Sequence, residues 1–343
     1  MIDQPLVAPA TPVHIRVFRG FRAVRRFPLL PVFVLGVVVV AGIFAPWIAP
    51  HDPTKGDLRD RNLPGFWAGD QTTMKIVVEE VEYGEAYRQV SLAEAQEIRP
   101  GAALGDQVEV VTRRTGGTEF LLGTDHLGRD LLSRTIHGAR ISLIMAAVTL
   151  GVGGTIGIVL GLLAGWNGRL IDELIMRLVD IELSLPLILV ALVLVVALGQ
   201  SLTIIIAVLA VWIWPRFARM VRGEVLQLKN MDYVSLARVA GASPLRIMVV
   251  HLLPGTINTL IVVATLQVGI VILVEASLSF LGAGVPPPEP AWGSMVAEGR
   301  DRLADAWWIA TIPGIAVLLT VMSLNLFGDW LRDKLDPRLR QIE

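Results

Sequence analysis

Residues 183–215 read LSLPLILVALVLVVALGQSLTIIIAVLAVWIWP and contain no charged side chain. As a single helix, rising about 1.5 Å per residue, this run would reach about 50 Å. That length exceeds the roughly 30 Å thickness of a bilayer's hydrocarbon core. The run is weakest at Gly199-Gln200-Ser201, where turn-forming residues interrupt the aliphatic sequence. We therefore predict two membrane-spanning helices joined there by a tight turn, in a polytopic membrane protein.

Working outward, four more segments meet the requirement of about 20 mostly apolar residues per membrane helix. They are Leu29–Ala49, Ile141–Gly168, Thr256–Leu281 and Trp307–Phe327. The composition agrees, because 53% of the residues are hydrophobic and only 18% are charged, whereas soluble domains have about 25% charged residues. The sequence therefore predicts an all-α polytopic membrane protein with six transmembrane helices.

The distribution of basic residues predicts the orientation, because cytoplasmic loops carry an excess of Lys and Arg. Arginines precede the first span at Arg16, Arg19, Arg22, Arg25 and Arg26. The N-terminus is therefore expected in the cytoplasm, and an even number of spans returns the C-terminus to the same side. The first apolar run lacks a small-residue cleavage site, so we interpret it as an anchor of an inner-membrane protein rather than as a signal peptide.

This orientation divides the chain into five segments. They are a cytoplasmic N-terminal segment (1–27), a first transmembrane helix (28–50), an extracytoplasmic segment (51–140), a transmembrane core (141–330) with a cytoplasmic loop at 221–254, and a cytoplasmic tail (331–343). Within the extracytoplasmic segment, residues 66–118 have a different pattern. Lys75–Glu82 and Gln107–Thr112 are enriched in β-branched residues, and Thr115–Thr118 has the Gly-Gly of a hairpin turn. We expect a small, partly β lobe.

The cytoplasmic loop has the pattern of two short helices with a corner between them. The first is expected over Asp232–Ala240, and Gly241 suits the left-handed position after a helix end. Ser243 and Pro244 suit the start of a second helix, which would end near Leu253. Pro254 would then mark the entry to the next span. An amphipathic loop lying on the membrane surface is the alternative interpretation.

This stretch resembles the EAA loop of ABC importer permeases. Ala237, Gly241, Leu253 and Pro254 match that pattern at the right spacing. Three positions depart from it: Ser235 stands in place of the acidic residue, Leu236 in place of the first alanine, and His251 in place of isoleucine. A salt bridge from position 235 to an ATPase is therefore not assumed.

Further motifs narrow the resemblance to the C-type permeases of dipeptide and oligopeptide (Dpp/Opp) importers. Leu122–Arg134 is similar to their GTDxxGRDxxSR segment. Glu275–Gly282, Ala291–Gly293 and Asn325–Arg338 also fit that group in the expected order. The resemblance extends over nearly the whole chain from Pro28 and is weakest across the 66–118 insertion.

The resemblance implies a type I ABC importer that moves di- or oligopeptides across the inner membrane. The implied partners are a second, B-type permease, two cytoplasmic ATP-binding subunits, an extracytoplasmic substrate-binding protein and the lipid bilayer, without nucleic acid. The insertion would help to dock the binding protein. ATP and Mg would be bound by the partner ATPases, and this chain would hold no cofactor. An importer of the same type that carries another solute, such as nickel or glutathione, is the alternative.

The resemblance also implies roles for individual residues. The ATPase-coupling loop would use Ser235, Ala237, Arg238, Gly241, Ala242, Ser243, Arg246, Leu253 and Pro254. The extracytoplasmic motif comprises Gly123, Thr124, Asp125, Gly128, Arg129 and Asp130. Independently of the resemblance, Glu275 lies near the outer end of the fifth predicted span, where a buried carboxylate is costly and points to a function. We expect it to support the gate by bonding to the loop after Gly282, with direct substrate contact as the alternative.

Other chemistries find little support in the sequence. A Walker A loop needs Gly-Lys, but the four lysines follow Thr54, Met74, Leu228 and Asp333. The chain has no cysteine and shows no inverted repeat of the kind found in secondary transporters. Paired catalytic groups at membrane depth, which an intramembrane enzyme would need, are also not apparent.

Two groups of charged residues have a structural and a functional interpretation. The acids and imidazoles of Asp125, His126, Asp130 and His137 lack tight metal-ligand spacing, so a capped, charged corner before the second span is expected instead. Asp180 and Glu182, close to Arg177 in sequence, are expected to form a solvated ion-pair cluster. Lining the cytoplasmic mouth of the pathway is their alternative role.

Overall fold

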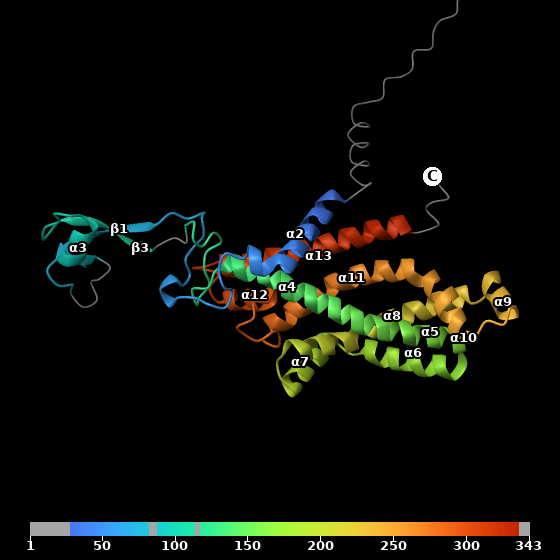
Figure 1. Ribbon diagram of the computed structural model, residues 1–343. Coiled ribbons are helices and arrows are strands. Elements are labelled where there is room, and N and C mark those ends of the chain that lie inside the picture. The colour runs from blue at the N-terminus through green and yellow to red at the C-terminus, as the bar shows by residue number, and fades with distance from the viewer. Residues whose placement is uncertain (1–27, 82–87, 114–116, 336–343) are drawn as a thin grey trace, which may run out of the picture.

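The computed structural model describes residues 28–81, 88–113 and 117–335. They form an elongated bundle of long helices with a small β lobe extending from one end (Figure 1). The helices of the bundle are α2 (Leu29–Ile48), α4 (Leu131–Thr149), α5 (Thr155–Asn167), α6 (Arg169–Ser184), α7 (Leu187–Leu198), α8 (Leu202–Leu228), α9 (Asp232–Val239), α10 (Pro244–Ile247), α11 (Leu253–Phe280), α12 (Trp292–Arg300) and α13 (Trp308–Leu335). A 3-10 turn lies at Leu58–Asp60.

Among the described residues, five helices are long and apolar enough to cross a membrane. Two of them are compound: α4 and α5 run on through a π-helical turn at Leu150–Gly154, and α10 and α11 through another at Met248–Leu252. The expected six spans are reached if α6 and α7 form one broken span, because these helices meet at an angle of 88°. Pro186, which precedes α7, lacks the N–H needed to continue α6.

The turn predicted at Gly199-Gln200-Ser201 is confirmed, since α7 ends at Leu198 and α8 begins at Leu202. Two of the helices begin before the apolar segments that were predicted as spans. The second span begins at Leu131 rather than at Ile141, and the fifth begins at Pro244 rather than at Thr256. These helices extend beyond their apolar stretches because capping residues outside the membrane, rather than hydropathy, determine where they begin.

Glycines at every fourth position bring α5 and its preceding turn into contact with α8. A Cβ on Gly157 would lie 2.3 Å from the carbonyl oxygen of Trp214, and one on Gly161 would lie 2.6 Å from that of Ala218. Gly153 and Gly165 make equally close approaches to α8. Small residues spaced in this way let membrane helices approach backbone to backbone, which gives packing attraction where lipid supplies no hydrophobic drive.

The lobe consists of β1 (Gln71–Val78), β2 (Gln89–Ser91), α3 (Leu92–Ile98) and β3 (Gln107–Arg113). Its strand order is β2-β1-β3, with β2 parallel and β3 antiparallel to β1. The lobe has its own core of Val77, Val90, Ala95, Ala102, Val108 and Val110. At its base the two connecting segments are joined by the bond from Phe66 N to Leu121 O, 3.0 Å long.

The two strands expected in the insertion are present, with β1 beginning four residues earlier than predicted. The hairpin turn expected at Thr115–Thr118 falls largely on residues 114–116, which lie outside the described part. Beyond Gly117 the chain forms turns instead of a strand until it reaches α4. Since β3 already pairs with β1 across the insertion, it does not need a following strand. The sequence analysis missed the short β2 and α3.

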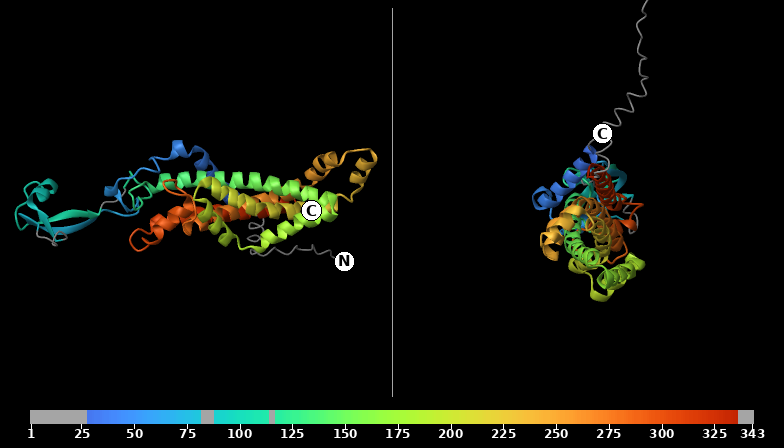
Figure 2. Two further views of the ribbon diagram at one scale, coloured as in Figure 1. Left: turned by 90° about the horizontal axis from the view of Figure 1, so that it is seen from below. Right: turned by 90° about the vertical axis from the view of Figure 1, so that its right-hand side faces the viewer.

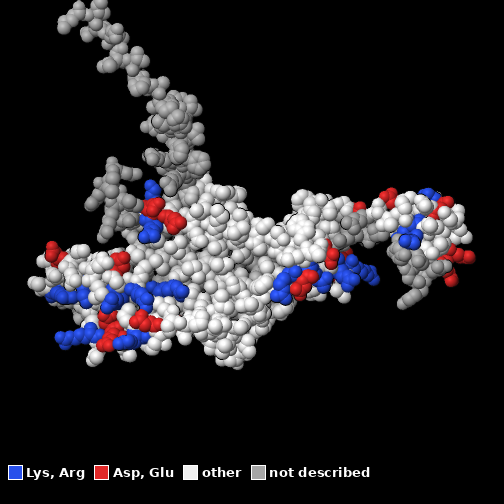
Figure 3. Space-filling model, turned by 180° about the vertical axis from the view of Figure 1, so that it is seen from behind, with Lys and Arg blue, Asp and Glu red and all other residues white. Residues whose placement is uncertain are grey.

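The lobe and the α9–α10 segment lie at opposite ends of the bundle (Figures 1 and 2). Between them the face shown in Figure 3 is largely free of charged side chains, which collect toward both ends. This is the pattern expected of a protein that spans a bilayer. Below, these ends are called the lobe end and the knob end, and the knob is residues 232–247.

Candidate functional site

The knob is built around a left-handed corner at Gly241. Helix α9 ends at Val239, and Gly241 has φ +79°, as the sequence predicted. Two bonds close the corner: Gly241 N donates to Arg238 O, and Ala242 N donates to Ala237 O, each at 3.0 Å. This pair is the Schellman arrangement, which satisfies carbonyls left free at a helix end. The corner therefore has one defined geometry.

The second helix of the knob starts as predicted but does not end as predicted. The hydroxyl of Ser243 accepts a bond from Arg246 N (3.3 Å), and Pro244 occupies the first turn. The helix then continues to Phe280 instead of ending near Leu253. Pro254, expected to mark the entry to the next span, lies in the first turn of α11, just after a π-helical turn whose wider hydrogen-bond pattern accommodates a residue without an N–H.

The knob presents exposed apolar side chains to its surroundings. Leu236 is 68% exposed, Val239 87% and Leu245 67%, whereas Val234 and Ile247 are buried and hold the two helices to the bundle. The other predicted coupling residues lie on or beside this surface. Ser235, Arg238, Gly241, Ser243 and Arg246 are exposed, and Ala237 and Ala242 are half-buried, while Leu253 and Pro254 lie at the start of α11.

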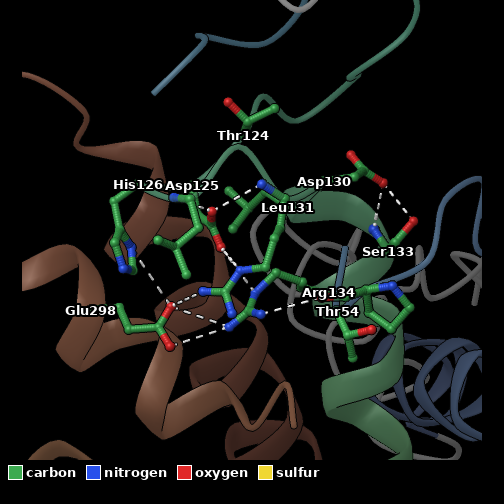
Figure 4. Close-up of polar contacts among 12 residues, drawn as sticks. Thr54, Thr124, Asp125, His126, Asp130, Leu131, Ser133, Arg134 and Glu298 are labelled. Atoms are coloured by element: carbon green, nitrogen blue, oxygen red, sulfur yellow. Dashed lines mark hydrogen bonds and ion pairs between the residues drawn. The ribbon is translucent and has the colours of Figure 1, made fainter. Parts of the chain in front are cut away.

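At the lobe end, the predicted extracytoplasmic motif forms a buried corner before α4 (Figure 4). Asp130 caps the helix by accepting a bond from Ser133 N (2.9 Å). Asp125 accepts bonds from the backbone N–H groups of Leu127 and Arg129. The Arg129 Nε also donates to Asp125 Oδ2 at 2.6 Å. The capped and charged corner expected from the sequence is therefore present.

Backbone requirements explain the two glycines and the threonine of this motif. Gly123 and Gly128 have φ of +78° and +75°, and a Cβ on Gly128 would lie only 1.8 Å from the carbonyl oxygen of Asp57. The Thr124 hydroxyl accepts a bond from Leu63 N (2.8 Å), and its carbonyl accepts one from the Trp308 indole (3.1 Å). The motif thus fixes the segment before the lobe against the start of α13.

Two essential members of this corner were missed by the sequence analysis. Arg134, 1% exposed, places its Nε 3.3 Å from Asp125 Oδ2 and its Nη2 3.2 Å from Glu298 Oε2. Arg129 Nη2 reaches the same Glu298 oxygen at 2.8 Å. Arg134 could have been predicted, because it lies in the motif one helical turn after Asp130. Glu298 lies on α12, and no sequence pattern around it indicates a role in this corner. We call Asp125, Arg129, Arg134 and Glu298 the charged corner.

Two members of the charged corner, together with His126, form the one group of side chains among the described residues with the spacing for a metal ion. Ligand atoms of Asp125, His126 and Glu298 lie within 4.8 Å of one another. Both carboxylates already accept bonds from guanidinium groups. The corner is therefore charge-balanced by two arginines, and the donor set fits an ion-pair cluster better than a divalent cation.

Glu275 is 1% exposed in α11, near the lobe end. Its Oε1 accepts a bond from the Ser279 hydroxyl (2.7 Å) on the next turn, and its Oε2 has no partner. The expected bond to the loop after Gly282 was wrong. That loop contacts Ser279 instead, because a Cβ on Gly284 would lie 1.8 Å from the Ser279 hydroxyl oxygen. Glu275 therefore reaches the loop only through Ser279.

Near the knob end, acidic side chains of α6 face arginines of α8. Arg222 holds Asp172 with two bonds, of 3.0 and 2.6 Å, and Arg219 pairs with Asp180. Asp180 was expected to pair with Arg177, but Arg177 lies 3.8 Å from Glu173 on the same helix. The ion pairs therefore tie α6 to α8 instead of lying within α6, and the Asp180–Arg219 pair is exposed, as expected of a solvated ion pair.

Comparisons with known proteins agree with this architecture. The family model described as "Binding-protein-dependent transport system inner membrane component" matches residues 157–341, more than half of the chain. A second model, "N-terminal TM domain of oligopeptide transport permease C", matches residues 29–64. The lobe lies between these two matched segments.

Curated relatives cover nearly the full length. The di/tripeptide transport system permease protein DppC of Pseudomonas aeruginosa is 40% identical over 89% of this chain and 86% of its own. The dipeptide transport system permease protein DppC of Haemophilus influenzae is 35% identical over 99% and 100%. The glutathione transport system permease protein GsiD of Escherichia coli is 36% identical over 98% and 95%. The chain therefore belongs to the binding-protein-dependent transport system inner membrane components, as a multi-pass permease of the dipeptide and oligopeptide C type.

Proposed function

We propose that this chain is the C-type permease of an ABC importer that moves di- or oligopeptides across the inner membrane. Its partners are a second, B-type permease, two ATP-binding subunits at the knob end and a substrate-binding protein at the lobe end. ATP and Mg are bound by the ATP-binding subunits, so this chain is a transport subunit and not an enzyme. Both of its termini lie in the cytoplasm.

The observation that carries the proposal is the knob. A rigid corner closed by two backbone bonds holds the exposed Leu236, Val239 and Leu245 at one end of a membrane bundle. Exposed apolar side chains on a fixed scaffold are typical of protein docking surfaces. At this end, force from ATP hydrolysis in a partner would pass through Val234 and Ile247 into the bundle.

The test is Gly241→Val. A β-branched residue at φ +79° is strained by about 1 kcal/mol or more, while the space around the new Cβ is open within this chain. Membrane insertion should therefore be intact, and co-purification of the ATP-binding subunits and peptide uptake by proteoliposomes should both fall. Gly223→Val is the matched control, because Gly223 lies within α8, away from the corner, also with open space around it. Wild-type co-purification and uptake in Gly241→Val would refute the coupling role.

Glutathione is the second candidate solute, because GsiD of Escherichia coli aligns with almost all of the chain. In this architecture a separate binding protein performs most of the selection. Calorimetric titration of that binding protein with a dipeptide library and with glutathione distinguishes the two. Tight binding of glutathione alone would replace the peptide assignment.

A further inference from the structure

A hollow between α6, α7 and α8 has the composition of a small binding site. Its volume is about 340 Å³, within the range of ligand pockets. The lining is aliphatic and aromatic except for one carboxylate, that of Glu182, and includes Leu178, Leu194, Val211, Trp212 and Trp214. We propose that this hollow receives the free amino end and the apolar first side chain of a peptide during transport. The proposal rests on the peptide-transport function argued above.

Glu182 supplies the first step of the argument. Its Oε1 is buried and has no hydrogen-bond partner. A buried oxygen of this kind is costly unless a donor arrives, and the cost is larger for a carboxylate than for a neutral group. An ammonium group offers three donors and the opposite charge.

The neighbouring groups do not fill this role. The Trp214 indole and Arg216 both stabilise the Glu182 carboxylate, but Oε1 remains without a hydrogen-bond partner, and the Arg216 guanidinium stacks on Trp212, 3.6 Å from the ring centroid. It also donates from Nη1 to the carbonyl of Trp212 at 3.4 Å. This arrangement holds Arg216 against its own helix and leaves the buried Glu182 oxygen open to another donor.

The surrounding charges indicate that this face borders water rather than lipid. Along α8, Arg222, Arg219 and Arg216 lead from the knob end into the bundle. On α6, Asp172 and Asp180 pair with the first two of these arginines. Ionisable residues at membrane depth face the bundle interior or a water-filled cavity and mark substrate pathways. A row of acid–base pairs that ends at Glu182 therefore fits the inner half of a permeation pathway.

The apolar remainder of the hollow restricts the solute. Beyond the carboxylate the lining offers aliphatic and aromatic contacts, so an apolar first residue gains hydrophobic burial there. A solute whose amino end carries a second carboxylate, as glutathione does, would place that charge against Glu182 or the apolar wall. The hollow thus favours peptides with a free amine and an apolar first side chain.

Cysteine protection tests the proposal, because the chain has no cysteine of its own. Val211→Cys places a thiol on the hollow at a position that is 57% exposed, and Leu170→Cys places one on α6 outside it. The rate of maleimide labelling is measured on the complete transporter in nanodiscs, in the presence of either leucyl-leucine or N-acetyl-leucyl-leucine. We expect leucyl-leucine to protect Val211→Cys from labelling at a concentration about tenfold lower than N-acetyl-leucyl-leucine requires, as one charged hydrogen bond implies. Neither peptide should affect labelling of Leu170→Cys.

Adding Glu182→Gln to Val211→Cys should abolish this difference between the two peptides, whereas Glu173→Gln, the same change on the exposed part of α6, should preserve it. Equal protection by both peptides would overturn the proposal. A Val211→Cys thiol that does not react with maleimide would also overturn it, because the hollow would then be covered by lipid or by the second permease. Full uptake of leucyl-leucine by a transporter with Glu182→Gln would also contradict the proposed binding site, but it would leave the proposed transport function intact. A wild-type transporter that imports no peptide would instead refute the proposed function.

Discussion

The two ends of the bundle are rigid for different physical reasons. The charged corner at the lobe end combines the buried Asp125 and the partly buried Glu298 with two guanidinium groups, and Arg129 and Arg134 are at most 3% exposed. The knob contains no ion pair among its described residues. Its shape depends on the Schellman bonds at Gly241, the Ser243 cap and the burial of Val234 and Ile247.

The difference bears on what each end can do. Buried and mutually compensated charges lock elements together and leave little surface for a partner. A corner made from backbone bonds keeps its shape while its apolar side chains remain free to be covered by another protein. We therefore expect substitutions at the charged corner to change stability, and substitutions on the knob to change association.

The largest expected difference between the two ends is in their accessibility to a reagent outside the cell, because we expect them to lie on opposite sides of the membrane. Leu104→Cys, 55% exposed in the lobe, should react with an impermeant maleimide added to intact cells. Ser235→Cys, exposed on the knob, should react only after the membrane is opened. Mass shift on a gel measures both. External labelling at position 235 would reverse the proposed orientation.

The next largest effect is expected for Arg134→Ala. Its removal leaves the buried Asp125 and the partly buried Glu298 with one guanidinium between them. Breaking a buried ion-pair cluster from one side costs about 3–5 kcal/mol. Thermal unfolding in detergent should show a large loss of stability. Arg177→Ala, which removes an exposed arginine paired within α6, is the control and should change little. Similar melting of the two variants would mean that the corner is not structural.

An intermediate effect is expected when the lobe is excised between Ala68 and Phe120, with a short glycine linker. Phe66 and Leu121 already meet at the base, so the bundle should keep its thermal stability. Affinity for the substrate-binding protein should fall about tenfold, or about 1.4 kcal/mol. Val77→Asp, which charges the core of the lobe, should act in the same direction. Wild-type affinity in both variants would show that the lobe is not part of the docking surface.

The sequence predicted best what depends on neighbouring residues. The corner at Gly241, the cap at Ser243 and the break at residues 199–201 each follow from local backbone chemistry. The membrane helices follow from the lengths of the apolar runs. Some of these helices extend beyond the apolar runs because caps such as Asp130 lie outside them.

What the sequence did not reveal depends on contacts between distant segments. Glu298 approaches Arg134 across 164 positions, and no spacing rule connects them. The pairing of Asp180 with Arg219 likewise required the packing of α6 on α8. The π-helical turn before Pro254 was missed because the proline alone suggested a helix start. Roles in coupling and docking remain predictions, since they involve surfaces of other chains.

The smallest effect, and the finest test of the contrast between the ends, is expected for Ser243→Ala. The hydroxyl of Ser243 satisfies Arg246 N at 3.3 Å on the exposed side of the knob. Loss of a serine cap costs about 1 kcal/mol, and Ile247 would still anchor α10. Global thermal stability should therefore hardly change, while hydrogen exchange at Arg246 should accelerate about fivefold, because the first turn opens locally. Ser243→Asp restores an acceptor and should return the exchange rate toward wild type. If Ser243→Ala instead lowered thermal stability as much as Arg134→Ala, the knob would be part of the folding core, and the division between a locked end and a docking end would be wrong.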